Sequence, residues 1–494
     1  MTALVVPLVL LSTLTQTPAA KPPPLPPPRD LVARAIAAMG GETAVRGIRN
    51  YTITFYSATF ALGQEETPQS PARANVTTGT QTTDFANGRQ LTVTEVRNPA
   101  GAVNKQRRIT AGRIGMLETN GAQAPDGPGA VANVERLWRR EFDRLLISAL
   151  DNPATLRPLP TRTWRGERVD GVHYVNGPDT MDVYFDRRSG FPVLTETITD
   201  DPVLGDRRTV TACTRWQEAD GIVYARQFDT EVNGRLQTNT VLTALAINRP
   251  IDDSLFLIPD SIKAKAQPSD PTPPSIVVNL VELAPNVWRA EGGTHHSLVV
   301  DQGKRLVVAE APLSAQRMEA LLDTLRSKFP GKPVGLVINT HHHWDHAGGL
   351  RTVLAANLPI VTHARNVSFV HSIGTARKTM RPDALSRSGH PSGSTITSVE
   401  DSLVVGTGDT RVMVYRLPSA HVEGLLAVYV PAAKILFQSD VVSAAPNPPA
   451  PGSAELIKFV KARGINVDRV AGGHGLVIPW GDVERAATPP ASAP

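Results

Sequence analysis

The sequence predicts two domains of different fold class, an N-terminal antiparallel β-sheet with helices (α+β) and a C-terminal α/β domain. Three observations lead to this prediction. The chain has 494 residues, which is too many for one ordinary hydrophobic core. A segment rich in proline, serine and charged residues, 264–275 (AKAQPSDPTPPS), interrupts it. Apolar residues recur at every second position before that segment, whereas strands and helices alternate after it.

Composition argues against a nucleic-acid partner and against a cysteine-based metal site. The net charge of +5 is mild for this length, and Lys and Arg are scattered without a long basic run, so a nucleic-acid partner is not favoured. The chain has one cysteine, Cys213, which can form no disulfide within the chain and cannot by itself make a cysteine-type zinc site. We expect a small-molecule substrate, and the sequence leaves the oligomeric state open.

Export is predicted from the first 20 residues. An apolar run, 3–14, is too short to span a membrane and resembles the h-region of a signal peptide, with small residues at 17–20 as a cleavage zone. No Lys or Arg precedes this run, so the n-region is atypical. We expect residues 1–20 to direct the protein to a periplasm or beyond. No later segment is long and apolar enough to cross a bilayer.

A proline-rich spacer, 21–28 (KPPPLPPP), leads into the predicted N-terminal domain, 29–260. A helix is expected over 30–39, where Gly40 and Gly41 stop it, and a second over 134–150, where apolar residues share one side. Strands are indicated by alternating apolar and polar residues, for example at Tyr51, Ile53 and Phe55, at Leu91 and Val93, and at Met181, Val183 and Phe185. Hairpin turns are predicted at 186–190 and at Asn233–Gly234.

The end of this domain resembles a periplasmic lipoprotein-carrier fold. The resemblance rests on 216–224 (WQEADGIVY), on the Thr-rich strands that follow, and on 252–259 (DDSLFLIP). It implies a curved sheet wrapped around a helix. No titratable cluster with ligand spacing occurs in this domain, so it either binds an apolar molecule or positions the second domain.

We expect a linker over 261–275, a second domain over 276–485 and a disordered tail over 486–494. The second domain begins with strands near 276–283 and 287–291, and residues 292–297 are expected to form a loop. A helix is predicted over 314–327, from apolar residues at helical spacing.

The chemistry is concentrated in residues 340–349 (THHHWDHAGG), which directly follow a short apolar run, 334–339, that is typical of a buried strand. His341 and His343 are two apart in an extended segment, so both rings point to the same side and can share a metal ion. Asp345 and His346 reach a second position close by. Imidazole nitrogens combined with a carboxylate suit zinc better than calcium or magnesium.

This His-x-His-x-Asp-His pattern resembles the zinc signature of the metallo-β-lactamase superfamily, and the resemblance covers about 276–485. It implies a four-layer αββα sandwich. His421, Asp440 and His474, each next to a predicted strand, match the later zinc motifs of that superfamily. The complete set of ligands that the resemblance implies is therefore His341, His343 and His421 for one zinc, and Asp345, His346 and His474 for the other, with Asp440 bridging.

The resemblance further implies two Zn²⁺ ions per chain, a hydroxide that bridges them as the nucleophile, and Asp345 as the catalytic residue that orients it and moves a proton. The leading interpretation is an exported dinuclear zinc hydrolase that cleaves an ester, lactone, thioester or related bond. The alternatives are a β-lactamase, a mononuclear iron sulfur-dioxygenase and a non-catalytic carrier protein. The superfamily motifs do not identify the substrate.

Other polar residues near the motif are left without a ligand role. His295, His296, His342 and His363 are expected at most to line the pocket. A polar segment, 371–398, is interpreted either as a loop over the site that meets an anionic substrate or as a solvated loop.

Overall fold

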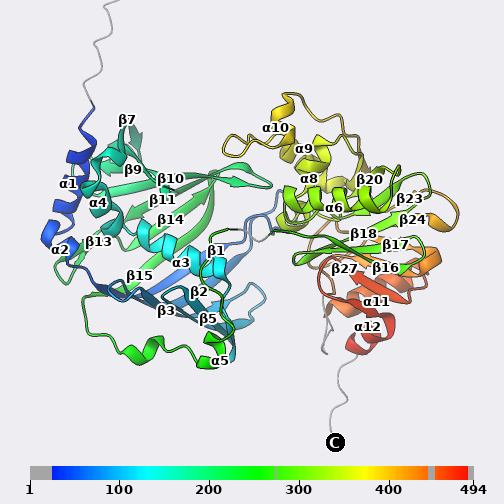
Figure 1. Ribbon diagram of the computed structural model, residues 1–494, viewed down its shortest axis with the longest axis horizontal. Coiled ribbons are helices and arrows are strands. Elements are labelled where there is room, and N and C mark those ends of the chain that lie inside the picture. The colour runs from blue at the N-terminus through cyan, green and yellow to red at the C-terminus, as the bar shows by residue number, and fades with distance from the viewer. Residues whose placement is uncertain (1–24, 178, 273–274, 443–450, 488–494) are drawn as a thin grey trace, which may run out of the picture.

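The computed structural model describes residues 25–177, 179–272, 275–442 and 451–487, and it shows two domains side by side (Figure 1). The predicted signal peptide, residues 21–24 of the proline-rich spacer and residues 488–494 of the predicted tail lie outside the described residues. Within the described part of the chain, no helix is long and apolar enough to cross a membrane.

The N-terminal domain contains a 13-stranded antiparallel sheet in the order β6-β5-β4-β3-β2-β1-β15-β14-β11-β10-β9-β8-β7. Its strands are β1 (Asn50–Phe60), β2 (Ala74–Asp84), β3 (Arg89–Arg97), β4 (Val103–Ala111), β5 (Ile114–Thr119), β6 (Ala122–Pro125), β7 (Leu156–Trp164), β8 (Glu167–Asn176), β9 (Asp179–Asp186), β10 (Pro192–Asp201), β11 (Gly205–Thr214), β14 (Gln227–Val232) and β15 (Arg235–Ile247). A separate two-stranded sheet pairs β12 (Gln217–Ala219) with β13 (Ile222–Tyr224). Both predicted hairpins are confirmed, because β9 turns into β10 and β14 into β15 at the expected positions.

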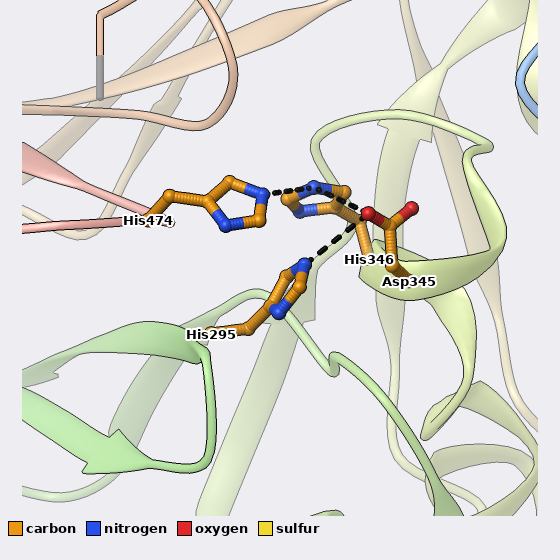
Figure 2. A group of neighbouring side chains, drawn as sticks. All are labelled: His295, Asp345, His346 and His474. Carbon is orange, nitrogen blue, oxygen red and sulfur yellow. Dashed lines mark hydrogen bonds and ion pairs between the residues drawn. The ribbon is translucent and has the colours of Figure 1, made fainter. Parts of the chain in front are cut away.

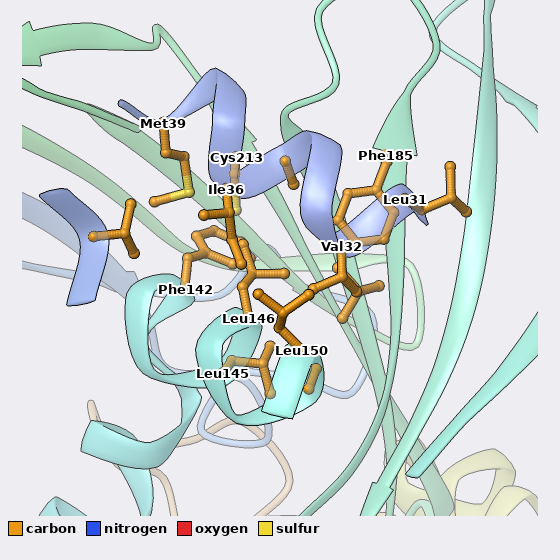
Figure 3. Packing of buried hydrophobic residues seen from close by; sticks show 14 of the residues in the cluster. Leu31, Val32, Ile36, Met39, Phe142, Leu145, Leu146, Leu150, Phe185 and Cys213 are labelled. Carbon is orange, nitrogen blue, oxygen red and sulfur yellow. The ribbon is translucent and has the colours of Figure 1, made fainter. Parts of the chain in front are cut away.

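Helices pack against this sheet and form the core of the domain. The first, α1 (Pro28–Ala38), confirms the helix predicted near the N-terminus, and α2 (Glu42–Arg46) follows it. Ile36 of α1 and Leu146 of α4 (Phe142–Asp151) meet Phe185 and Cys213 of the sheet in one buried cluster (Figure 3). The resemblance of this domain to lipoprotein carriers stays a prediction.

The single helix predicted over 134–150 is wrong, because two helices occur there, α3 (Pro128–Arg140) and α4. They are separated at Glu141, whose ψ of 139° is not helical. The carboxylate of Glu141 accepts hydrogen bonds from the hydroxyls of Tyr51 at 3.2 Å and Tyr224 at 2.8 Å. Helical periodicity continues across the break, and only these tertiary partners reveal why the backbone turns.

The segment predicted as a linker, 261–275, stays close to the N-terminal sheet over much of its length. Ile262 lies in α5 (Asp260–Lys263) and packs in a cluster with Ile109 and Met116. Farther along, the amide of Ser269 donates to the carbonyl of Arg113 at 2.6 Å.

The C-terminal domain has two sheets with helices on their outer faces. One sheet has the order β16-β17-β18-β19-β20-β21-β22 and the other β23-β24-β25-β26-β27-β28. The strands of the first are β16 (Asn279–Ala284), β17 (Val287–Gly292), β18 (His295–Asp301), β19 (Leu306–Ala309), β20 (Val334–Ile338), β21 (Ile360–His363) and β22 (Ile396–Val399). Those of the second are β23 (Ser402–Val405), β24 (Val412–Arg416), β25 (Leu426–Val430), β26 (Ile435–Gln438), β27 (Arg469–Gly472) and β28 (Val477–Pro479).

Three layers of apolar contacts hold this domain together. Between the two sheets, strand residues such as Ile338 and Phe437 are fully buried. The outer face of the first sheet packs against α6 (Ala315–Lys328), α8 (Leu350–Ala355), α9 (Val367–Thr375) and α10 (Ala384–Ser388). The outer face of the second packs against α11 (Pro451–Arg463) and α12 (Trp480–Ala487), which extends two residues into the predicted tail. The predicted αββα architecture is therefore confirmed.

Two connections of the N-terminal sheet reach the C-terminal domain (Figure 1). The β10–β11 turn places Val203 in the helical core of the C-terminal domain, and near it the ammonium of Lys378 donates to the Asp201 carbonyl at 3.1 Å. The β1–β2 connection, 61–73, extends to the loops at the ends of the C-terminal strands.

Candidate metal centre

The predicted His-x-His-x-Asp-His motif lies at the carboxyl end of β20, on a loop that runs into the one-turn helix α7 (Trp344–Ala347). The apolar residues of β20 are buried between the layers, so the polar residues that follow emerge at the edge of the sheet. His341, His343 and His346 are at most 1% exposed, whereas the side chain of Asp345 is 36% exposed.

The other three predicted ligands come from the second sheet. His421 lies between β24 and β25, Asp440 follows β26 and His474 follows β27. Tertiary structure brings all seven predicted residues together in two adjoining groups. Within each group, the possible ligand atoms all lie within 4.8 Å of one another. One group holds His341, His343, His421 and Asp440, and the other holds His295, Asp345, His346 and His474 (Figure 2).

Asp440 lies between the two groups and presents one oxygen to each. Its Oδ2 is 2.9 Å from Nε2 of His421 and 3.3 Å from Nε2 of His341. Its Oδ1 is 3.1 Å from Nε2 of both His346 and His474. This division of the two carboxylate oxygens is the arrangement that a bridging ligand needs.

The geometry fits metal ions better than it fits hydrogen bonds. Among the described residues, Nε2 of His341 and Oδ1 of Asp440 are buried without a hydrogen-bond partner, although each lies close to other ligand atoms. His343 Nδ1 and His421 Nε2 are 3.0 Å apart. Two atoms bound to one tetrahedral zinc at about 2.0 Å lie about 3.3 Å from each other. Such orphaned, converging atoms are what a metal ion satisfies.

The second nitrogen of each motif histidine has its own partner, as is usual for metal ligands. His341 Nδ1 is 3.0 Å from the Thr340 hydroxyl. His346 Nδ1 is 2.6 Å from Glu310 Oε2. A carboxylate only accepts, so Nδ1 of His346 carries a proton and Nε2 is the nitrogen that faces Asp440 and could bind a metal ion.

Glu310, for which the sequence predicts no role, lies directly against the predicted ligands His341 and His346. It follows β19 directly, has a φ of 79° and is fully buried. Besides His346, its carboxylate accepts hydrogen bonds from Thr340 and, at 2.5 Å, from Ser439. Its one sequence signal was an acidic residue directly after an apolar strand.

His295 was expected only to line the pocket, from a loop over 292–297. The expected loop is wrong, because β18 begins at His295. The strand places the His295 ring in the second group of possible ligands. Its Nε2 lies 3.2 Å from Oδ2 of Asp345, and its ring centroid is 3.9 Å from that of His474 (Figure 2). His295 can therefore act either as a hydrogen-bond donor to Asp345 or as a further metal ligand.

Burial and neighbouring charge adjust the protonation of the site. Burial, followed by the charge of His346, lowers the pKa of His341 to about 3, so the ring is neutral at pH 7. Burial alone would raise the pKa of Asp345, but the hydrogen bond from His295 and the charge of His346 outweigh it and lower that pKa. Neutral imidazoles and ionised carboxylates are the forms that bind metal ions. His341 and Asp345 therefore already have the binding form. Burial lowers the pKa of His346, but Glu310 and Asp440 outweigh it and raise that pKa, so His346 would lose a proton when a metal ion binds.

The remaining histidine candidates, His296, His342 and His363, belong to none of the groups of possible ligands among the described residues. His342 is buried beside a small cavity of about 250 Å³ that is also lined by Trp344 and Phe369. The segment 371–398 lines a separate cavity of about 710 Å³, and none of the seven predicted ligands borders it. The interpretation of this segment as a loop over the site is therefore wrong, because it packs against α8 and the β10–β11 turn instead.

Solved structures of metallo-β-lactamases resemble part of the chain. A metallo-β-lactamase from Pontibacter korlensis is 18% identical, with 42% of this chain and 97% of that chain covered and a TM-score of 0.33. A metallo-β-lactamase from Hirschia baltica is 15% identical, with 43% of this chain and 96% of that chain covered and a TM-score of 0.33. The metallo-β-lactamase FIM-1 from Pseudomonas aeruginosa in its mono-zinc form is 13% identical, with 44% of this chain and 95% of that chain covered and a TM-score of 0.35.

No curated protein matches the chain. The family model of the metallo-β-lactamase superfamily matches residues 290–474, which include all seven predicted ligands. Over this match, the C-terminal domain has the metallo-β-lactamase fold, which is that of a superfamily of metal-dependent hydrolases.

Proposed function

We propose that the protein is a dinuclear zinc hydrolase that cleaves an ester, lactone, thioester or related bond. The observation that carries this proposal is the position of Asp440, whose two oxygens divide between two groups of histidines. His341, His343 and His421 would hold one ion, and Asp345, His346 and His474 the other, with Asp440 shared. His295 is close enough to join the second group.

Zinc ions bound at these positions would supply a water molecule that ionises near neutral pH and positive charge for the developing oxyanion. The residues of the chain supply orientation and proton transfer. The side chain of Asp345 is partly exposed, in contrast to the buried His341, His343 and His346 of the same motif, so its carboxylate can face an entering substrate. From that position it can orient the attacking water and accept its proton.

Asp440 also favours esters and related substrates over β-lactams. In one group of β-lactamases a cysteine takes this position, and Cys213, the sole cysteine here, is buried in the other domain. A carboxylate shared by two ions adds negative charge between them, which lowers their Lewis acidity and holds the pair together. We therefore expect esters, lactones or thioesters to react faster than penicillins, cephalosporins or carbapenems.

The proposal is tested by elemental analysis and a substrate panel on the purified full chain. We expect close to two zinc ions per chain and the highest kcat/KM on an ester, lactone or thioester. Iron as the main metal would instead favour a sulfur-dioxygenase, and the highest kcat/KM on a β-lactam would favour a β-lactamase. Metal-loaded protein that hydrolyses none of the panel would favour the carrier alternative.

We also propose export to a periplasm or beyond, on the basis of the apolar run over 3–14. N-terminal sequencing of protein recovered from cell fractions tests this. Export predicts a mature chain that starts near residue 21 outside the cytoplasm, and an intact N-terminus in the cytoplasm would contradict it.

A further inference from the structure

The β1–β2 connection of the N-terminal domain, 61–73, lies directly on the metal centre of the C-terminal domain. Three of its backbone carbonyls meet three points around the site. Gly63 O accepts from the amide of Trp344 at 3.3 Å, Glu65 O lies 2.9 Å from Nε2 of His343, and Glu66 O accepts from the amide of Glu423 at 2.8 Å. The connection therefore follows the surface of the ligand loops rather than touching them at one point.

Gln64 contacts a predicted metal ligand through its side chain. Its Nε2 donates to Oδ1 of Asp345 at 2.8 Å. The other oxygen of that carboxylate, Oδ2, lies 3.2 Å from His295. Asp345 is thus held from two sides, by His295 of its own domain and by Gln64 of the other, and these two bonds restrict the rotation of its carboxylate.

Glu65 orients a second predicted ligand through its backbone. A carbonyl oxygen can only accept, so the proton of the His343 ring must sit on Nε2. The lone pair of Nδ1 then faces His421 Nε2, 3.0 Å away, inside the first group of ligands. For this histidine, the outer hydrogen bond that metal ligands usually make comes from the N-terminal domain.

The connection is seated tightly and anchored in its own domain. A Cβ atom added at Gly63, whose φ is 83°, would lie 2.1 Å from the indole of Trp344, so only glycine fits there. The side chain of Glu65 is buried and pairs at 2.5 Å with Arg235 at the start of β15. The N-terminal sheet therefore determines where Gln64 and the Glu65 carbonyl lie.

We propose that the N-terminal domain completes the metal centre, with Gln64 as the positioning residue for Asp345. This inference rests on the proposed function for its chemistry. It implies that the first domain is more than a carrier or spacer, because it fixes the carboxylate that orients the attacking water and helps hold the second metal ion.

The test compares Gln64→Ala with Gln69→Ala in the full chain. Gln69 is a matched control, since it lies on the same connection and bonds Ser368 of the C-terminal domain at 3.2 Å, away from the metal centre. Zinc affinity is measured by competition with a chelator, and kcat and KM are measured on the best substrate of the panel. Circular dichroism and the melting temperature show whether each variant folds like the wild type.

We expect Gln64→Ala to weaken the binding of one zinc ion about tenfold and to lower kcat more than it raises KM, because loss of an outer-shell partner typically costs 10- to 100-fold. Gln69→Ala should change neither. In an Asp345→Ala background, Gln64→Ala should have no further effect on zinc affinity, because its partner is gone.

Wild-type zinc affinity in folded Gln64→Ala, or an equal loss in Gln69→Ala, would overturn the inference. Zinc affinity is measured without turnover, so it decides the role of Gln64 even if the wild type hydrolyses nothing. A wild type that binds zinc but hydrolyses no substrate of the panel would refute the proposed function and leave the role of Gln64 intact.

Discussion

Replacing Glu310 with Gln removes one negative charge from behind the metal centre while it keeps the shape of the side chain. The carboxylate of Glu310 accepts from Nδ1 of His346 and from the hydroxyls of Thr340 and Ser439. In the variant, the amide oxygen can still face His346, and either hydroxyl can rotate to accept from the amide nitrogen. The substitution therefore tests the charge on the partner of His346 rather than the packing.

The magnitude follows from the role of the hydrogen bond to His346. Burial lowers the pKa of His346, but the charge of Glu310 and the hydrogen bonds to Asp440 and Glu310 raise it well above its ordinary value. A more basic imidazole donates more strongly to a metal ion, and loss of such a partner typically weakens metal binding 10- to 100-fold. This corresponds to about 1.4 to 2.7 kcal/mol of binding free energy.

The assay is chelator competition for zinc with Glu310→Gln, Glu310→Ala and the control Glu319→Gln, which changes an exposed side chain on α6. We expect about tenfold weaker binding of one zinc in Glu310→Gln and no change in the control. Glu310→Ala should also lower the unfolding free energy, because each donor left unsatisfied in the interior costs about 1 to 3 kcal/mol. Unchanged zinc affinity in Glu310→Gln would refute the assigned role.

Two further predictions concern Asp440 and Glu141. Asp440→Ala should lower the occupancy of both zinc ions, and activity with it, because each group of histidines loses the carboxylate oxygen that faces it. Elemental analysis measures the occupancy, and retention of both ions with full activity would contradict the bridging assignment. Burial, followed by the charge of Asp143, raises the pKa of Glu141 from 4.5 to about 7. Between pH 4.5 and about 7, Glu141 is therefore mostly protonated in the folded state and mostly ionised in the unfolded state. The stability from this proton is fully present below pH 4.5 and is lost as the pH rises to about 7, a difference of at most about 3 kcal/mol. The melting temperature of the wild type should therefore fall more between pH 5 and pH 8 than that of Glu141→Gln, and parallel pH profiles would show that the proton on Glu141 does not matter.

The sequence by itself determined the parts of this protein whose signals are local. His341, His343, Asp345 and His346 lie within six residues after an apolar strand, so their spacing alone predicts a shared site. Period-two and helical patterns, together with the proline-rich segment, were enough to predict two domains of different class. His421, Asp440 and His474 are far apart in the chain, and only their resemblance to later zinc motifs linked them to the site.

Only the tertiary structure decided which residues surround those ligands. Glu310 is a single polar residue after an apolar strand, and His295 is one of two adjacent histidines at the start of β18. Nothing in their immediate sequence separates a buried partner of a metal ligand from an ordinary turn residue. The break at Glu141 depends on two tyrosines that lie 90 and 83 residues away. Gln64 lies 281 residues from Asp345 and in another domain. Periodicity and motif spacing describe neighbours along the chain, whereas these contacts exist because two folded surfaces meet.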